Sequence, residues 1–105
     1  MGSASLSYSA ASILLAIGNG YRYGFDVMDI TGLPSGTVYP ALRRLEQAGL
    51  IGSKWEQEAI AQREQRPPRK YYSITRTGEA ALDGALKRYP LLNRMSAQLP
   101  QKSET

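Results

Sequence analysis

The chain lacks both cysteine and histidine, two residue types that enzymes use frequently. Without cysteine it has no disulfides, thiolate zinc sites or cysteine nucleophiles, and this absence fits a reducing cytoplasm. Without histidine, most serine, cysteine and metal-dependent catalytic arrangements are also excluded. Carboxylate, lysine and tyrosine chemistry remains, but the sequence shows no paired constellation of these groups. We therefore expect no enzyme, no metal site and no cofactor.

Long hydrophobic runs are missing as well. The longest apolar stretch, residues 10–17, is interrupted by Ser12 and is too short to cross a bilayer. No basic leader precedes it, as a signal peptide would require. These features predict a soluble, cytoplasmic protein without a membrane partner. With 105 residues, the chain predicts one small domain of modest stability, which a partner subunit would increase.

The charge that is present is unevenly distributed. The formal net charge is +4. Residues 43–76 contain eight basic and four acidic side chains, whereas the rest of the chain contains five of each sign. A basic segment of this kind predicts an electrostatic footprint for a polyanion. A solvated basic surface without a partner is the alternative.

Residues 35–48 show the clearest helical pattern in the chain. A step of about 100° per residue gathers apolar side chains on one face and small, hydroxyl and basic side chains on the other. Ser35 is placed to cap the first turn, and Gly49 to end the helix before an apolar strand. The polar face predicts a helix that enters a DNA groove; an ordinary surface helix with a tolerated proline is the alternative. The apolar face is Val38, Ala41, Leu42 and Leu45, and the polar face is Gly36, Thr37, Pro40, Arg43, Arg44 and Gln47.

The remaining pattern predicts three more helices and a β-hairpin. Helices are expected over residues 5–17, over residues 23–30, and after Thr75, which is placed to cap a helix that Pro90 bends or interrupts. Residues 51–59 and 69–74 are interpreted as two strands, joined by a mobile connection over residues 59–68. The expected fold class is mainly α with a small two-stranded β-wing, which is a winged helix-turn-helix.

Three motifs in this order resemble the PadR-like family of winged helix-turn-helix transcriptional regulators, in its form with a short C-terminus. Together they lie between about residues 13 and 86. The tyrosine-proline helix followed by the basic, tyrosine-containing wing at this separation is typical of the family. The motifs are Tyr23-Gly24-Phe25; Gly36-Thr37-Val38-Tyr39-Pro40-Ala41-Leu42-Arg43-Arg44-Leu45-Glu46 followed by Gly49-Leu50-Ile51; and Arg69-Lys70-Tyr71-Tyr72-Ser73-Ile74-Thr75 followed by Gly78.

The resemblance implies a dimeric cytoplasmic repressor that presents two recognition helices to successive major grooves of a pseudo-palindromic operator in double-stranded DNA. Residues 5–74 would form the DNA-binding domain, with the helix at 35–48 in the major groove and the wing at 51–74 on the backbone. Residues 75–98 would form a C-terminal dimerisation helix, and the polar residues 99–105 are expected to be disordered. A small-molecule effector is a further partner that the family allows. A winged-helix module that binds RNA or a protein partner is the alternative.

Two sets of contact residues follow from this interpretation. The DNA contacts combine the start and polar face of the recognition helix with basic side chains of the wing, which we expect on phosphates. The dimer contacts are those implied by the family, in which the C-terminal helix packs against the first helix of the partner. The DNA set is Ser35, Gly36, Thr37, Tyr39, Pro40, Arg43, Arg44, Arg66, Arg69 and Lys70, and the homodimer set is Leu6, Ile13, Leu14, Leu82, Leu86, Tyr89, Leu91, Leu92 and Met95.

The aromatic residues near the wing carry separate expectations. We expect the indole of Trp55 to pack within the structure rather than to line a ligand pocket. Tyr71 and Tyr72 face opposite sides of their strand, so one is expected in the core and the other near DNA or Trp55. Tyr39 lies on the flank of the recognition helix, where packing against its own domain and a phosphate contact are both open.

Overall fold

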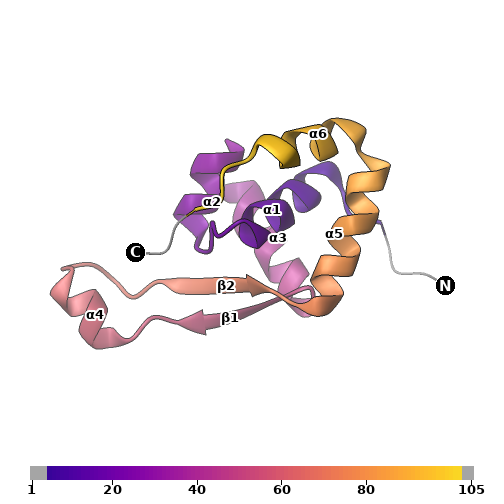
Figure 1. Cartoon of the computed structure of the whole chain (residues 1–105). Helices are drawn as coiled ribbons and strands as arrows, with labels where there is room; N and C mark the ends of the chain where they lie inside the picture. The colour runs from indigo at the N-terminus through magenta and orange to yellow at the C-terminus, as the bar shows by residue number, and fades with distance from the viewer. Residues whose placement is uncertain (1–4, 103–105) are drawn as a thin grey trace.

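The computed structural model describes residues 5–102 as a helical body with one projecting hairpin (Figure 1). The antiparallel sheet runs from the pair Ile51 and Ile74, next to the body, to the pair Trp55 and Lys70. The predicted fold class, mainly α with a two-stranded wing, is confirmed. In chain order the elements are α1 (Tyr8–Gly18), α2 (Gly24–Thr31), α3 (Ser35–Gln47), β1 (Ile51–Trp55), α4 (Glu58–Arg63), β2 (Lys70–Ile74), α5 (Arg76–Arg88) and α6 (Pro90–Gln98).

The main core lies where α1, α2 and α3 meet the base of the hairpin. The apolar face predicted for the recognition helix is confirmed, because all four of its side chains are at most 3% exposed. Ile13 and Leu14 of α1 and Val27 of α2 are fully buried against it. Burying a side chain of this size stabilises the fold by about 1.5–3 kcal/mol. This cluster therefore fixes α3 in the body by one face and leaves its opposite face outside.

Of the two helix caps predicted from the sequence, one is found and one is not. Thr75 caps α5 as predicted, because its hydroxyl accepts a hydrogen bond from the amide of Gly78 at 3.0 Å. Ser7 does the same for α1. The prediction for Ser35 was wrong: Pro34 occupies the cap position, and Ser35 is already the first residue of α3. The carbonyl of Pro34 accepts hydrogen bonds from the amides of Thr37 and Val38, and no side-chain cap forms because the proline ring has no acceptor.

The distal part of the hairpin differs from the prediction of a long strand and a mobile connection. Strand β1 ends at Trp55, and helix α4 follows at the far end of the hairpin (Figure 1). Ala61 is buried in this small unit. Glu58 in the first turn and Arg63 in the last turn have the signs that complement the helix dipole. The wing therefore carries a helical tip.

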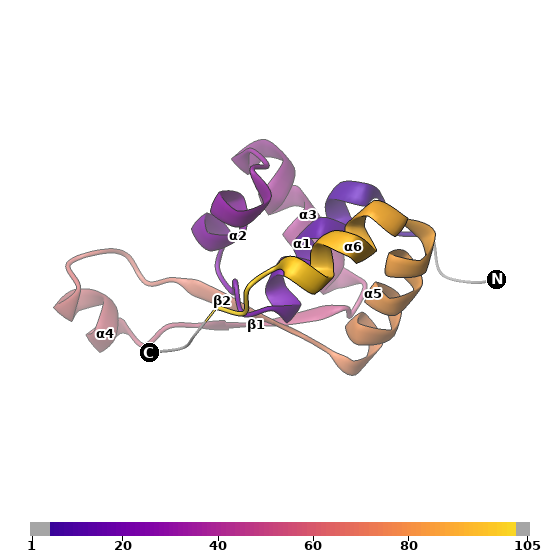
Figure 2. The ribbon, with the colours of Figure 1, turned by 45° about the horizontal axis from the view of Figure 1, so that its top comes forward.

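Helix α6 folds back over α1 of the same chain (Figure 2). Pro90 ends the preceding helix and begins α6, since a proline is tolerated in the first turn of a helix. Leu92 packs with Ala11 and Leu15 of α1 and is 1% exposed. Three residues that we expected at a dimer surface are thus placed inside the protomer: Ile13, Leu14 and Leu92.

Residues 99–102 cross the turn between α1 and α2, so over these four residues the structure differs from the expected disorder. The hydroxyl of Tyr21 donates to the carbonyl of Pro100 at 3.0 Å, and the amide of Lys102 donates to the carbonyl of Asn19 at 2.9 Å. The ammonium of Lys102 pairs with Asp26 of α2. Residues 103–105 lie outside the described part of the chain.

Candidate nucleic-acid interface

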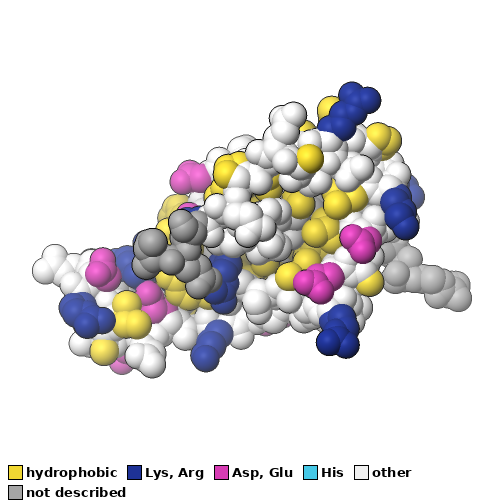
Figure 3. All heavy atoms as spheres, viewed as in Figure 1, with side chains coloured by type: hydrophobic (Ala, Val, Ile, Leu, Met, Phe, Trp, Pro, Cys, Tyr) yellow, Lys and Arg dark blue, Asp and Glu magenta, His cyan; other side chains and the backbone are white. Residues whose placement is uncertain are grey.

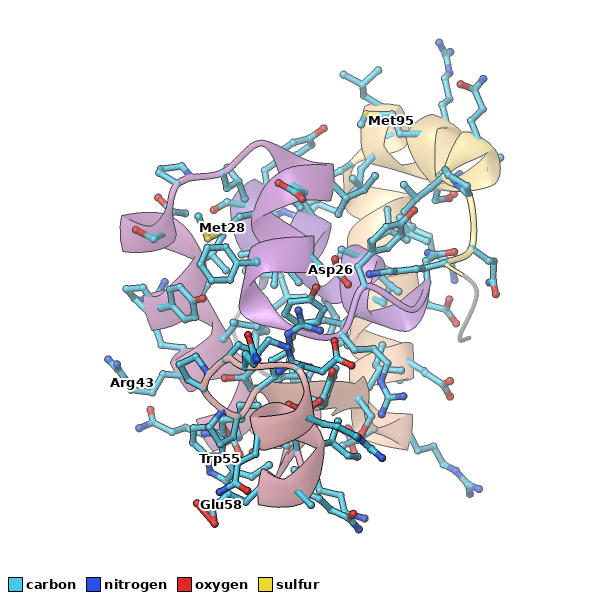
Figure 4. The ribbon with its side chains drawn as sticks, turned by 90° about the vertical axis from the view of Figure 1, so that its left-hand side faces the viewer. Asp26, Met28, Arg43, Trp55, Glu58 and Met95 are labelled. Carbon is cyan, nitrogen blue, oxygen red and sulfur yellow. The ribbon has the colours of Figure 1, made fainter. Side chains whose placement is uncertain are left out.

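The face of α3 that turns away from the core is open along its length. Ser35, Gly36, Arg43 and Gln47 are exposed on it, and Pro40 is partly exposed. Arg43 projects outward (Figure 4) and makes no ion pair with any other residue that the structure describes. Gln47 was placed on this face by its spacing but not counted among the contacts. The open face offers the exposed guanidinium of Arg43, small side chains at its start and the side-chain amide of Gln47 near its end.

The two flanks of α3 have different neighbours. On one flank Tyr39 packs so closely on Gly24 of α2 that a Cβ atom at Gly24 would overlap the phenol ring. Tyr39 is nevertheless 40% exposed, so it both packs against its own domain and reaches the surface. On the other flank Arg44 lines a groove of about 950 Å³ between α3, α5 and the start of α1. Although Arg43 and Arg44 are adjacent in the sequence, Arg43 lies on the open face of α3 and Arg44 lies at the groove beside α5.

The hairpin is attached to α3 through Glu46. This carboxylate accepts a hydrogen bond from the hydroxyl of Ser53 on β1 and lies 3.6 Å from the ammonium of Lys70 on β2. Tyr72 is the core member of the tyrosine pair, as expected for one of the two. Burial raises the pKa of the Tyr72 phenol, and the nearby charge of Glu46 raises it further. One face of the wing is therefore held against the recognition helix.

The opposite face of the wing is organised around Glu56. Its carboxylate accepts two hydrogen bonds from the guanidinium of Arg66, at 2.6 and 2.9 Å, and one from the amide of Arg69 at 3.2 Å. The hydroxyl of Tyr71 donates to it at 3.4 Å. The hydrogen bonds from Arg66 are the main cause that lowers the pKa of Glu56 from 4.5 to about 2. This set of four residues, which we call the Glu56 cluster, closes the tip of the hairpin.

The three wing cations expected on phosphates are therefore not equivalent. Arg66 is engaged with Glu56, so its charge is neutralised within the protein. Arg69 lies over the ring of Tyr23, 4.2 Å from its centroid, on the side of the Glu56 cluster. Lys70 lies on the side of α3, next to Trp55 and Tyr72. Of the three, only Lys70 shares a face with the recognition helix.

The expectation that Trp55 packs within the structure was wrong, because its side chain is 64% exposed. Trp55 is the last residue of β1 and lies opposite Lys70, where the hairpin has already left the helical body. Burial falls off along the strand from Ile51 outward. The sequence signal for this was the position of Trp55 far from the apolar start of the strand.

No site for other chemistry stands out in the described range, residues 5–102. It contains no group of acidic side chains arranged to hold a metal ion. None of its helices has the length and apolar character needed to span a bilayer.

The sequence profile of the family described as "Transcriptional regulator PadR-like family" matches residues 13–84, which is more than half of the chain. The chain belongs to this family. The matched part of this PadR-like regulator includes all of α2, α3 and the wing. The resemblance noted from the sequence motifs is therefore confirmed, and the protein is a winged-helix transcriptional regulator.

Solved structures of PadR-like proteins share the fold. A PadR-like transcription factor from Bacteroides fragilis is 27% identical, with a TM-score of 0.65 over 85% of this chain and 86% of that chain. A protein from Streptococcus mutans is 26% identical, with a TM-score of 0.63 over 88% and 87% of the two chains. A PadR family regulator from Clostridium difficile, 24% identical, has a TM-score of 0.64 over 85% and 95%. No curated protein matches the chain.

Proposed function

We propose that this PadR-like regulator is a cytoplasmic repressor that binds double-stranded DNA as a homodimer and has no catalytic step. Each subunit would insert α3 into the major groove of one half-site of a pseudo-palindromic operator and lay its wing on the backbone. The observation that carries the proposal is the open face of α3, where Arg43 is exposed and makes no ion pair within the described residues, beside a wing whose Ser53 is hydrogen-bonded to Glu46 of the same helix.

The first half of α3 suits close approach to DNA. Gly36 has open space around its α-carbon, so no side chain separates this turn from an approaching phosphate or base edge. Amides near a helix N-terminus favour anions. Ser35 and Thr37 add hydroxyls that can donate to phosphate oxygens. This end of the helix would therefore fix the position of the protein on the duplex.

The basic side chains divide between reading bases and holding phosphates. Arg43 lies midway along the open face, where a guanidinium can bind the two acceptors of a guanine. Arg44 lies on the flank toward α5 and is assigned to the phosphates on that side of the groove. Lys70 is assigned to the phosphates on the opposite side. Arg66 is assigned a structural role within the wing, because it is paired with Glu56.

The dimer would form through the outer surface of α6 and the start of α1. Leu91 and Met95 of α6 are 62% and 51% exposed, and the hydroxyl of Tyr8 reaches the sulfur of Met95 at 3.9 Å. Figure 3 shows hydrophobic side chains at the surface around α6. Leu86 and Tyr89, partly buried at the bend into α6, border this surface. Sedimentation of the purified protein tests the assignment, and a monomer that binds a lone half-site would contradict it.

Selection of bound duplexes from a random pool tests the function and recovers the half-site spacing. With the selected duplex, Arg43→Ala should weaken binding by about 1–3 kcal/mol and relax preference at one base position. Lys87→Ala, which removes an exposed cation from α5, is the control and should bind as the parent does. Equal affinities for all three proteins would refute the assignment of the reading face.

The salt dependence of binding distinguishes a DNA-binding regulator from the alternative, a module that binds RNA or a protein partner. Binding to duplex DNA should fall steeply with ionic strength while keeping a preference for the selected sequence. A module that recognises a protein partner would select no duplex, and one that recognises RNA would bind a folded RNA in preference to the selected DNA.

A further inference from the structure

Trp55 is the one tryptophan of the chain, and its indole is largely exposed on the side of the wing that faces α3. Tryptophan combines a large apolar ring with an N–H donor, and it is enriched at interfaces where one end of the ring packs and the other stays wet. Within the described residues, the ammonium of Lys70 lies 5.8 Å from the centroid of the ring.

The position of Trp55 relative to the recognition helix follows from the strand register. Trp55, Ser53, Lys70 and Tyr72 share one face of the sheet. Ser53 and Lys70 on this face contact Glu46 of α3. Trp55 therefore lies one step further out along the surface that begins with the recognition helix, and Figure 4 shows Trp55 and Arg43 on the same side of the molecule.

From this placement we infer that Trp55 forms a further DNA contact, in which its indole packs on the deoxyribose beside the phosphate assigned to Lys70. The inference rests on the proposed function. The DNA backbone alternates apolar sugars with anionic phosphates, and the wing offers an apolar ring and a cation side by side. Because both contacts are to the backbone, they add affinity without sequence preference.

The cation is available for this contact at little cost. Lys70 is paired with Glu46 at 3.6 Å, and both side chains are about one-third exposed, at 35% and 36%. Ion pairs at that exposure contribute little to stability, so the ammonium can turn to a phosphate. On the opposite face of the same hairpin, Lys54 is also exposed but points away from this surface, since it pairs with Tyr71 in the register.

Fluorescence of the single tryptophan reports directly on the inference. The selected duplex is titrated into the protein, with emission excited where tyrosine does not absorb, and binding is followed in parallel by the anisotropy of a label on the duplex. Emission should shift to the blue and become less accessible to acrylamide as the duplex binds. Trp55→Ala should bind all duplexes about fivefold to tenfold more weakly with unchanged sequence preference, and Trp55→Phe should recover part of the loss.

Lys70→Ala and Lys54→Ala form the matched pair for the phosphate. Removing Lys70 should reduce the slope of log affinity against log salt by about one phosphate contact, whereas removing Lys54 should leave it unchanged. The inference is wrong, and the proposed function stands, if the labelled duplex binds without changing the emission of the parent protein and Trp55→Ala binds the duplex as tightly as the parent does. If the parent protein binds no duplex, both fail. A blue shift produced by a folded RNA and not by the duplex would also overturn it.

Discussion

The helical body and the wing of this regulator are stabilised by different interactions. In the body, α1, α2 and α3 bury a continuous apolar cluster, and no polar or charged residue is buried among the described residues. Beyond Trp55, the wing has one buried apolar side chain, Ala61, and is closed by the Glu56 cluster. The helical body is therefore stabilised by burial of apolar side chains, and the far end of the wing by charge-assisted hydrogen bonds.

The largest effect should come from the core of the body. Leu42→Ala removes a side chain that is 1% exposed and should lower the free energy of unfolding by about 2–5 kcal/mol, through lost burial and the cavity left behind. Denaturant unfolding measures this change. Trp55→Ala in the wing is the comparison and should change stability by less than about 0.5 kcal/mol. Similar losses for both variants would show that the wing is part of the same cooperative core.

The contact between the body and the base of the wing can be tested at Gly78. A Cβ atom there would overlap the carbonyl oxygen of Leu50, which precedes β1. Gly78→Ala should therefore cost about 1–3 kcal/mol, because α5 must move away from the strand. Gly84→Ala in the same helix meets open space and should stabilise it by up to about 1 kcal/mol. Thermal unfolding measures both effects. If the two substitutions change the melting temperature in the same direction, the close approach of Gly78 to the carbonyl of Leu50 is contradicted.

The smallest effect should be confined to the wing tip and should depend on pH. The pKa of Glu56 in the folded protein, about 2, lies below its ordinary value of 4.5. The carboxylate therefore stabilises the tip fully above about pH 4.5, and this contribution is lost as the pH falls toward 2. Hydrogen exchange of the amides at 56–70, measured relative to their intrinsic exchange rate at each pH, should speed up over this range before that of the body.

Glu56→Gln should produce the same faster exchange at neutral pH, because it removes the charge that holds Arg66. Asp83→Asn, which removes an exposed carboxylate charge from α5, is the control and should leave the exchange of the tip unchanged. Faster exchange in the body at the same pH as in the tip would mean that the two regions are not independent.

The features that could be predicted from the sequence are those that depend on residues close together along the chain. The apolar face of α3 and the cap at Thr75 are local patterns, and both were found. Helix α4 was missed because it is short and polar, and its stability depends on a carboxylate and a guanidinium ten positions apart. A contact between residues this far apart leaves no periodic pattern in the sequence.

The misplaced dimer residues have a different cause. Helix α1 contacts α2, α3, α5 and β2, and α6 covers it as well, so apolar residues on several of its sides are buried within one chain. A stripe in the sequence cannot show whether a helix from the same chain or from a partner covers it. The exposure of Trp55 likewise depends on where the hairpin leaves the body, which is a property of the whole fold.

The anchoring of residues 99–102 has a practical consequence for work on this regulator. The ammonium of Lys102 lies 5.3 Å from the centroid of the Tyr23 ring, and the same ring carries Arg69 of the wing. The segment after α6 and the wing therefore meet at one aromatic ring, so a substitution of Tyr23 would alter both at once.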